Sequence, residues 1–278
     1  MIQDIEPRIF NNAFKNKKAE PHDLFLAYDG DTVLVREDKE KLWYPSFADF
    51  KEEYPELPDE SQFLFSIDDI NYYLVEKKGL DTVPGWSYVT TNRFRTELKY
   101  WRSFAGVVGW QLNRWYENHR FCSRCSKELV HSQKERMLYC KACGFQVYPV
   151  ISPCVIVGVY NGDKLLLTKY AGRAYRRFAL IAGFAEIGET LEQTVHREVQ
   201  EEVGLKVKNL QFYKSQPWPF TDTLLVGIFA ELDGEDTITI QEDELSLAVW
   251  VPREDIPPAE SNISLTSEMM EAFRKGLV

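Results

Sequence analysis

The sequence has no long apolar run and no excess of basic residues. No stretch approaches the roughly 20 consecutive apolar residues of a membrane span. The segment MIQDIEPRIFNNAF lacks a basic start followed by an apolar run, so no signal peptide is expected. The formal net charge of −10 argues against a broad nucleic-acid footprint, which needs clustered Lys and Arg. These absences predict a soluble, cytoplasmic protein without a membrane partner.

Cysteine is also scarce, and its spacing is informative. Four of the five cysteines form two CxxC pairs, Cys122 with Cys125 and Cys140 with Cys143. Four thiolates fill a tetrahedral Zn²⁺ site and leave no open position, which is typical of a structural site. A redox dithiol and an iron site of the same geometry are the alternatives. Cys154 has no partner pair and lies in an apolar run, so we expect a buried thiol.

Patterning predicts an α+β protein in three parts: an N-terminal domain (1–118), the cysteine segment (119–149) and a C-terminal domain (150–278). Hairpins are expected over 24–37, with Asp29-Gly30 at the turn, and from 151, with Asn161-Gly162 at the turn. Residues 63–76 predict a second strand pair. Apolar residues from Trp101 to Trp115 recur at helical spacing, which favours core packing or a subunit interface.

An acidic helix is predicted between Gly188 and Glu202, starting near Thr190 and stopping at Gly204. Leu191, Val195, Val199 and Val203 form its apolar stripe. At about 100° per residue, Glu198 and Glu202 lie beside that stripe rather than opposite it. Such a carboxylate pair is costly unless a cation neutralises it, and oxygen ligands suit Mg²⁺ or Mn²⁺. The pattern favours metal-assisted phosphate chemistry; a charge-rich surface helix is the alternative.

The spacing of this segment is more specific still. Gly183, five residues, Glu189, seven residues and then REVQEEVGL (197–205) resembles a complete Nudix box. That box is the signature of enzymes that hydrolyse a nucleoside diphosphate linked to another moiety. With the four-cysteine segment upstream and SQPWPF (215–220) downstream, residues 119–250 resemble the NADH pyrophosphatase subfamily. The resemblance implies a zinc ribbon and a C-terminal α/β/α sandwich with a mixed sheet.

Residue roles follow from the resemblance. It implies zinc ligation by the four paired cysteines, and divalent-metal ligation by Glu198, Glu202, Glu244 and the Ala182 carbonyl. Glu201 belongs to the catalytic cluster with Glu198 and Glu202, as a ligand or as the group that orients the attacking water. Arg197 is expected to pair with Glu189. The implied substrate contacts are Glu135, Tyr148, Phe184, Gln216, Pro217, Trp218, Pro219, Phe220, Thr221, Asp222, Thr223 and Ser264, with Arg93 a weaker candidate.

The implied reaction is hydrolysis of NADH or NAD⁺ to nicotinamide mononucleotide and AMP, and removal of NAD caps from RNA. No Rossmann glycine fingerprint is present, as expected where the dinucleotide is a substrate. The alternatives are another Nudix substrate such as ADP-ribose, or a non-enzymatic zinc-ribbon binding module. Thr221 departs from the family's SQPWPFPxS pattern, in which a proline holds this position, and this difference loosens the loop. The resemblance also implies a homodimer, to which the Trp101–Trp115 helix is a candidate contributor.

Overall fold

The computed structural model describes residues 1–38, 41–96, 100–172, 177–259 and 263–278. They form two compact units, which are described separately. The C-terminal unit comprises Met1, 151–218 and 222–278. The N-terminal unit comprises 2–150 together with the short segment 219–221. The division into three domains at 118 and 149 stays a prediction.

Before the cysteine segment, the described residues of the N-terminal unit form two small sheets and one long helix. The first sheet has the order β1-β6-β7-β2, and in the second β4 lies between β3 and β5 and also pairs with β8. The strands are β1 (Phe10–Asn11), β2 (Leu24–Leu26), β3 (Tyr28–Asp29), β4 (Thr32–Asp38), β5 (Lys41–Trp43), β6 (Gln62–Ile67), β7 (Ile70–Leu74) and β8 (Ser87–Thr90). Short 3₁₀ turns span Phe47–Phe50, Leu80–Thr82 and Thr91–Arg95.

Helix α1 (Tyr100–Asn118) carries the aromatic stripe predicted from the sequence. Phe104, Leu112 and Trp115 are buried within the unit, which confirms the core-packing interpretation. Because these side chains are covered by their own chain, they are not available as a dimer contact. Residues 97–99 of the predicted helix lie outside the described residues.

The cysteine segment forms a three-stranded antiparallel sheet in the order β11-β10-β9. Its strands are β9 (Val130–His131), β10 (Leu138–Tyr139) and β11 (Gln146–Val147). Each two-residue strand is too short to be stable alone. The segment therefore depends on its cysteines for stability.

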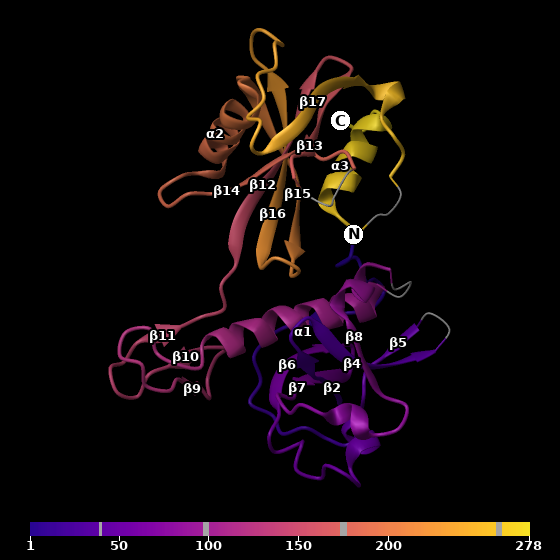
Figure 1. Ribbon diagram of the computed structural model, residues 1–278, viewed down its shortest axis with the longest axis vertical. Helices are drawn as coiled ribbons and strands as arrows, with labels where there is room; N and C mark the ends of the chain where they lie inside the picture. The colour runs from indigo at the N-terminus through magenta and orange to yellow at the C-terminus, as the bar shows by residue number, and fades with distance from the viewer. Residues whose placement is uncertain (39–40, 97–99, 173–176, 260–262) are drawn as a thin grey trace. The chain divides into compact units, whose positions relative to one another are not determined.

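The C-terminal unit is a mixed sheet between two helices (Figure 1). The strand order is β15-β16-β12-β13-β17, with β14 also paired to β12, and the β12–β16 pair is parallel. The elements are β12 (Ser152–Asn161), β13 (Lys164–Tyr170), β14 (Ile181–Phe184), α2 (Leu191–Val203), β15 (Val207–Trp218), β16 (Thr223–Leu232), β17 (Leu245–Pro252), a 3₁₀ turn (Arg253–Asp255) and α3 (Leu265–Arg274).

Alternation along β12 explains why both sheet faces are covered. Val155 and Val157 face the core that includes Val199 of α2. Cys154 and Ile156 face the core that includes Leu265, Met269 and Phe273 of α3. Successive strand residues point to opposite faces, so one apolar strand can support both layers. The predicted sandwich and the buried Cys154 are confirmed.

Both predicted hairpins form, with small differences. Asn161 pairs with Lys164 and Asp29 pairs with Thr32, so each turn centres on the glycine and the following residue. Each turn is thus one residue later than the Asn-Gly and Asp-Gly signals suggested. In the first hairpin β2 is not part of the pair but joins β7 in the other sheet.

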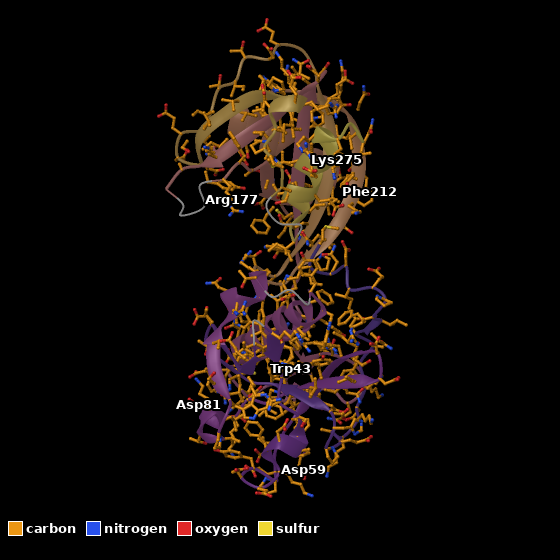
Figure 2. The ribbon with its side chains drawn as sticks, turned by 90° about the vertical axis from the view of Figure 1, so that its right-hand side faces the viewer. Trp43, Asp59, Asp81, Arg177, Phe212 and Lys275 are labelled. Atoms are coloured by element: carbon orange, nitrogen blue, oxygen red, sulfur yellow. The ribbon has the colours of Figure 1, made fainter. Side chains whose placement is uncertain are left out.

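The surface of the C-terminal unit carries an exposed aromatic residue on its outermost strand. Phe212 of β15 points away from the sheet (Figure 2). None of the helices in the described residues is both long enough and apolar enough to cross a membrane.

Candidate functional site

Helix α2 is fixed at both ends by local sequence. Thr190 is the N-cap, and its side chain and that of Gln193 bond each other's backbone N–H groups in a capping box. Gly204 ends the helix at a φ of 70°, a conformation that favours glycine. These contacts confirm the predicted boundaries and set the rotation of the helix on the sheet.

That rotation buries two of the three glutamates. Glu202 is 2% exposed and Glu198 is 9% exposed, whereas the Glu201 side chain is 54% exposed. Burial raises the pKa of Glu198, the carboxylates of Glu201 and Glu244 raise it further, and Arg197 opposes the shift. The helix therefore holds two carboxylates at the margin of the core, where a cation would stabilise their charge.

Gly183 on β14 lies directly against Glu198. A Cβ at residue 183 would be 1.8 Å from Glu198 Cδ and 2.0 Å from its Oε1. A side chain at residue 183 would displace the Glu198 carboxylate, so the glycine of the box provides space for it. Ala182, the proposed carbonyl ligand, is the adjacent residue of the same strand.

Glu244 reaches this region through a backbone connection. The Gln241 N–H donates to the Glu202 carbonyl at 3.0 Å, and the Glu244 N–H donates to the Gln241 carbonyl. This turn joins the end of α2 to the start of β17. The Glu244 carboxylate is exposed and close enough to Glu198 to affect its pKa.

Arg197 connects three carboxylates. It bonds both oxygens of Glu189, at 2.7 and 3.0 Å, as predicted. Its Nη1 also donates to Glu198 at 2.7 Å and to Glu201 at 3.0 Å. These two contacts were not predicted from the sequence, although Arg197 and Glu201 are four residues apart on the same helix and so lie on one face. A bound cation would thus share Glu198 with the guanidinium.

The Glu189–Arg197 pair predicts a pH dependence of stability. Hydrogen bonds from Arg197 lower the pKa of Glu189 to about 2, from an ordinary value near 4.5. Because the folded pKa is depressed, the stabilisation is present above about pH 4.5 and is lost as pH falls towards 2. We expect Glu189→Gln to be less stable than wild type in urea near pH 7, with the difference shrinking towards pH 3. Glu186→Gln, an exposed neighbour, is the control; a pH-independent difference would contradict the assignment.

Several implied substrate residues have structural partners in the C-terminal unit. Gln216 is buried, and its side-chain amide bonds the Ile263 carbonyl and the Leu265 N–H. Ser264 caps α3 by accepting from the Ser267 N–H. The Thr223 hydroxyl donates to the Trp218 carbonyl, while Phe184 ends β14 with an exposed ring. Gln216 therefore fixes the end of β15 against the start of α3, which Ser264 caps.

The turn after Trp218 belongs to the N-terminal unit. Arg114 of α1 donates to the Pro219 carbonyl at 2.8 Å, and the Arg95 guanidinium lies 3.9 Å from the Phe220 ring centroid. Phe220 is buried and Thr221 is exposed. These contacts join residues more than a hundred positions apart, so no local sequence signal could reveal them.

Of the remaining implied contacts, Pro217 and Asp222 belong to the C-terminal unit, and Glu135, Tyr148 and Arg93 belong to the N-terminal unit. The Tyr148 hydroxyl donates to Glu135 at 3.3 Å, so these two predicted residues are brought together. Arg93 is paired with Glu37 at 2.9 Å. The substrate roles of all these residues stay predictions.

The four paired cysteines converge on one point. Their Sγ atoms lie within 4.8 Å of one another, with Sγ–Sγ distances of 3.5 and 3.6 Å between neighbours. A tetrahedron with Zn–S bonds of about 2.3 Å has edges of about 3.8 Å. Burial opposes ionisation of Cys140, but hydrogen bonds from the Cys143 and Ala142 backbones and from neighbouring thiols lower its pKa to about 7. The geometry fits a closed zinc site.

The glutamates form a different kind of site. Among the described residues, only the cysteines place three or more ligand atoms within 4.8 Å of one another. Glu198, beside Gly183, and Glu202, one helical turn further along α2, are both buried and are called the acidic wall, whereas Glu201 and Glu244 are exposed. Carboxylate oxygens are the ligands preferred by hard divalent ions. Ligation of a divalent metal by these carboxylates stays a prediction.

Comparisons with known proteins identify two domains in the chain. A model of the NUDIX domain matches residues 151–273, and the NADH pyrophosphatase zinc ribbon domain matches 117–148. The NAD-capped RNA hydrolase NudC of Pseudomonas fluorescens (strain Pf0-1) is 35% identical over 203 residues, 72% of each chain. That of Shigella flexneri is 43% identical over 149 residues, 54% of this chain and 58% of its own.

Among solved structures that are similar to this chain is a crystal structure of a NUDIX hydrolase from Nitrosomonas europaea. It is 23% identical, with a TM-score of 0.49, and the match covers 56% of this chain and 90% of that one. The family models together cover both the cysteine segment and the C-terminal sandwich. The relative from Pseudomonas spans most of the chain. The chain is therefore a Nudix hydrolase that carries the zinc ribbon of the NADH pyrophosphatase family.

Proposed function

We propose that this chain hydrolyses the pyrophosphate bond of NADH and NAD⁺, giving a nicotinamide mononucleotide and AMP, and removes NAD caps from RNA 5′ ends. The observation that carries the proposal is the complete box, with Glu198 and Glu202 buried on α2 and Glu198 lying against Gly183, in a chain that also has the zinc ribbon. Relatives named as NAD-capped RNA hydrolases support the substrate assignment.

The residues would act as follows. Glu198, Glu202, Glu244 and the Ala182 carbonyl would hold Mg²⁺ or Mn²⁺, with Glu201 as a further ligand or as the group that orients water. The bound metal supplies charge neutralisation at the diphosphate and lowers the pKa of a bound water. Arg197 holds Glu198 and Glu201 in place from the opposite side. The carboxylates accept the proton released as water adds to phosphorus.

Substrate selection is assigned to residues at the ends of β14 and β15, to the turn that follows Trp218, and to Tyr148. Phe184 and Tyr148 present exposed ring faces suited to the nicotinamide, and residues Gln216 to Thr223 shape the loop. Gln216 acts through the backbone that it holds rather than through a free amide. A homodimer and a cytoplasmic location are also proposed, on the resemblance alone.

The direct test is product analysis. Incubation with NADH and Mg²⁺ or Mn²⁺ should release AMP, measured by chromatography. A comparison of kcat/KM for NADH, NAD⁺, ADP-ribose and NAD-capped RNA then ranks the substrates. Failure to form AMP from any dinucleotide contradicts the proposal, and a clear preference for ADP-ribose would favour the alternative Nudix substrate.

The contact between Arg114 and Pro219 predicts an effect on substrate binding. A hydrogen bond from a charged donor contributes about 1.5–3 kcal/mol. Removing the bond from Arg114 to the Pro219 carbonyl therefore loosens the turn beside Trp218. We expect Arg114→Gln to raise KM for NADH about tenfold while kcat changes little. Arg36→Gln is the matched control. Arg36 lies over the Trp86 ring of this unit, as Arg114 lies over the Trp110 ring. Equal KM values for the two variants would show that the turn does not position substrate.

A further inference from the structure

The zinc ribbon has a charge opposite to that of the whole chain. Residues 119–149 contain six of the 33 Lys and Arg residues but only two of the 43 Asp and Glu residues. One of the six, Arg136, is used internally, because it donates to backbone carbonyls of residues 12 and 64. The other five, Arg120, Arg124, Lys127, Lys134 and Lys141, are exposed.

Four of these exposed cations lie at the cysteine end of the ribbon. Arg124 lies between the first cysteine pair, Lys141 lies between the second, and both pairs converge on one point. Arg120 and Lys127 flank the first pair, where the Leu129 N–H donates to the Arg120 carbonyl. We call Arg120, Phe121, Arg124, Lys127 and Lys141 the knuckle surface. Within the described residues, none of its four cations forms an ion pair.

Aromatic rings are interleaved with these charges. Phe121 is 60% exposed, which is unusual for a large apolar side chain. The Arg124 guanidinium lies 5.1 Å from the Phe145 ring centroid. Arg120 and Phe121 also line a cavity of about 210 Å³ with Tyr116, His119 and His131; Glu76 and Glu128 line it too, so the cavity suits a base rather than a phosphate. Cations beside stacking faces and a ring-lined cavity are the features with which proteins bind single-stranded nucleic acid.

We propose that the knuckle surface binds the single-stranded RNA that follows an NAD cap. This inference rests on the proposed function, in which capped RNA is a substrate. The cations contact phosphates, and Phe121 stacks on a base at the mouth of the cavity. The acidic remainder of the chain confines RNA contact to this patch.

A structural explanation of the same charges makes a different prediction. Four thiolates around Zn²⁺ carry a formal charge of −2, which nearby cations could balance. In that case, removing the cations would weaken zinc binding rather than RNA binding. Zinc content therefore has to be measured in every variant.

The experiment uses the full-length zinc-loaded protein and charge-matched variants. The test variant is Arg120→Gln, Lys127→Gln, Lys141→Gln; the control is Lys51→Gln, Lys164→Gln, Lys206→Gln, three exposed lysines outside the ribbon. Each loses three positive charges. Measurements are the affinity for a fluorescent 5′-phosphorylated 12-nucleotide RNA as a function of salt, and kcat/KM for NADH and for NAD-capped RNA.

We expect the test variant to lose roughly tenfold in RNA affinity and in kcat/KM for capped RNA, with the logarithmic salt slope reduced by about 2. Its kcat/KM for NADH and its zinc content should match those of the control. Phe121→Ala should weaken RNA binding at least about fivefold without altering the salt slope.

The inference is overturned if test and control variants bind RNA equally, or if RNA affinity falls only together with zinc content. It is also overturned if wild type cleaves NADH but neither binds nor cleaves capped RNA. If the wild-type protein does not cleave NADH, the proposed function is contradicted instead. The RNA-binding measurement would then still decide the role of the knuckle surface.

Discussion

Glu202→Gln is expected to lower kcat for NADH by about 10³-fold or more while the protein stays folded. A metal ion contributes several kcal/mol to transition-state stabilisation, and each 1.36 kcal/mol is a factor of ten in rate. Glu202 is 2% exposed and lies one helical turn from Glu198, so no water or other carboxylate easily replaces it. Removing its charge relieves repulsion in the folded protein, so stability should be retained or increased.

The measurement combines steady-state kinetics with Mn²⁺ binding followed by calorimetry and with thermal unfolding. Glu192→Gln provides the control, because Glu192 is an exposed carboxylate on the same helix and is outside the acidic wall. It should keep wild-type kcat and Mn²⁺ affinity. A Glu202→Gln enzyme with undiminished kcat would show that the acidic wall does not hold the catalytic metal.

Loss of zinc is the second large effect. Structural zinc contributes an apparent 10–16 kcal/mol in small domains, and the strands β9, β10 and β11 have two residues each. Cys140→Ser should therefore abolish stoichiometric zinc binding and unfold the ribbon. A strong chelator should do the same to wild type at raised temperature, and added Zn²⁺ should restore the fold.

Metal analysis and thermal unfolding measure this effect. Cys154→Ala is the control, since Cys154 is buried in the C-terminal unit and is not one of the four converging cysteines. It should retain one zinc per chain. Iron in place of zinc, or a Cys140→Ser protein with an unchanged unfolding profile, would contradict a structural zinc site.

Local sequence predicted the parts of the site whose geometry depends on neighbours along the chain. Thr190 and Gly204 delimit α2, and the helical period alone placed Glu198 and Glu202 beside the apolar stripe. The same arithmetic put Glu201 farther round the helix, where it is exposed. The cysteine spacing predicted convergence at a metal because each pair is one tight turn.

Contacts between distant segments were not predictable. Gln216 meets Ile263 and Leu265 only because β15 packs beside α3, and Arg114 meets Pro219 across 105 positions. Neither residue type indicates its partner. The additional contacts of Arg197 with Glu198 and Glu201 depend on the rotamer of one long side chain, which periodicity cannot specify.

The aromatic helix shows a limit of another kind. Helical spacing from Trp101 to Trp115 was equally compatible with core packing and with a subunit interface. Burial of Phe104 and Trp115 inside the unit decides for the core. A periodic pattern tells which face of a helix is covered, and the tertiary structure tells what covers it.

The close approach of Gly183 and Glu198 bears on how degenerate relatives are recognised. The backbone at Gly183 is outside the left-handed region, so another residue could adopt its conformation. What excludes other residues is volume, since the carboxylate fills the place of a side chain. A relative that keeps all three glutamates but has alanine at this position would have to move its metal-binding carboxylate. Such a protein would preserve the acidic signature with one carboxylate displaced, so the glycine belongs to the definition of the site together with the glutamates.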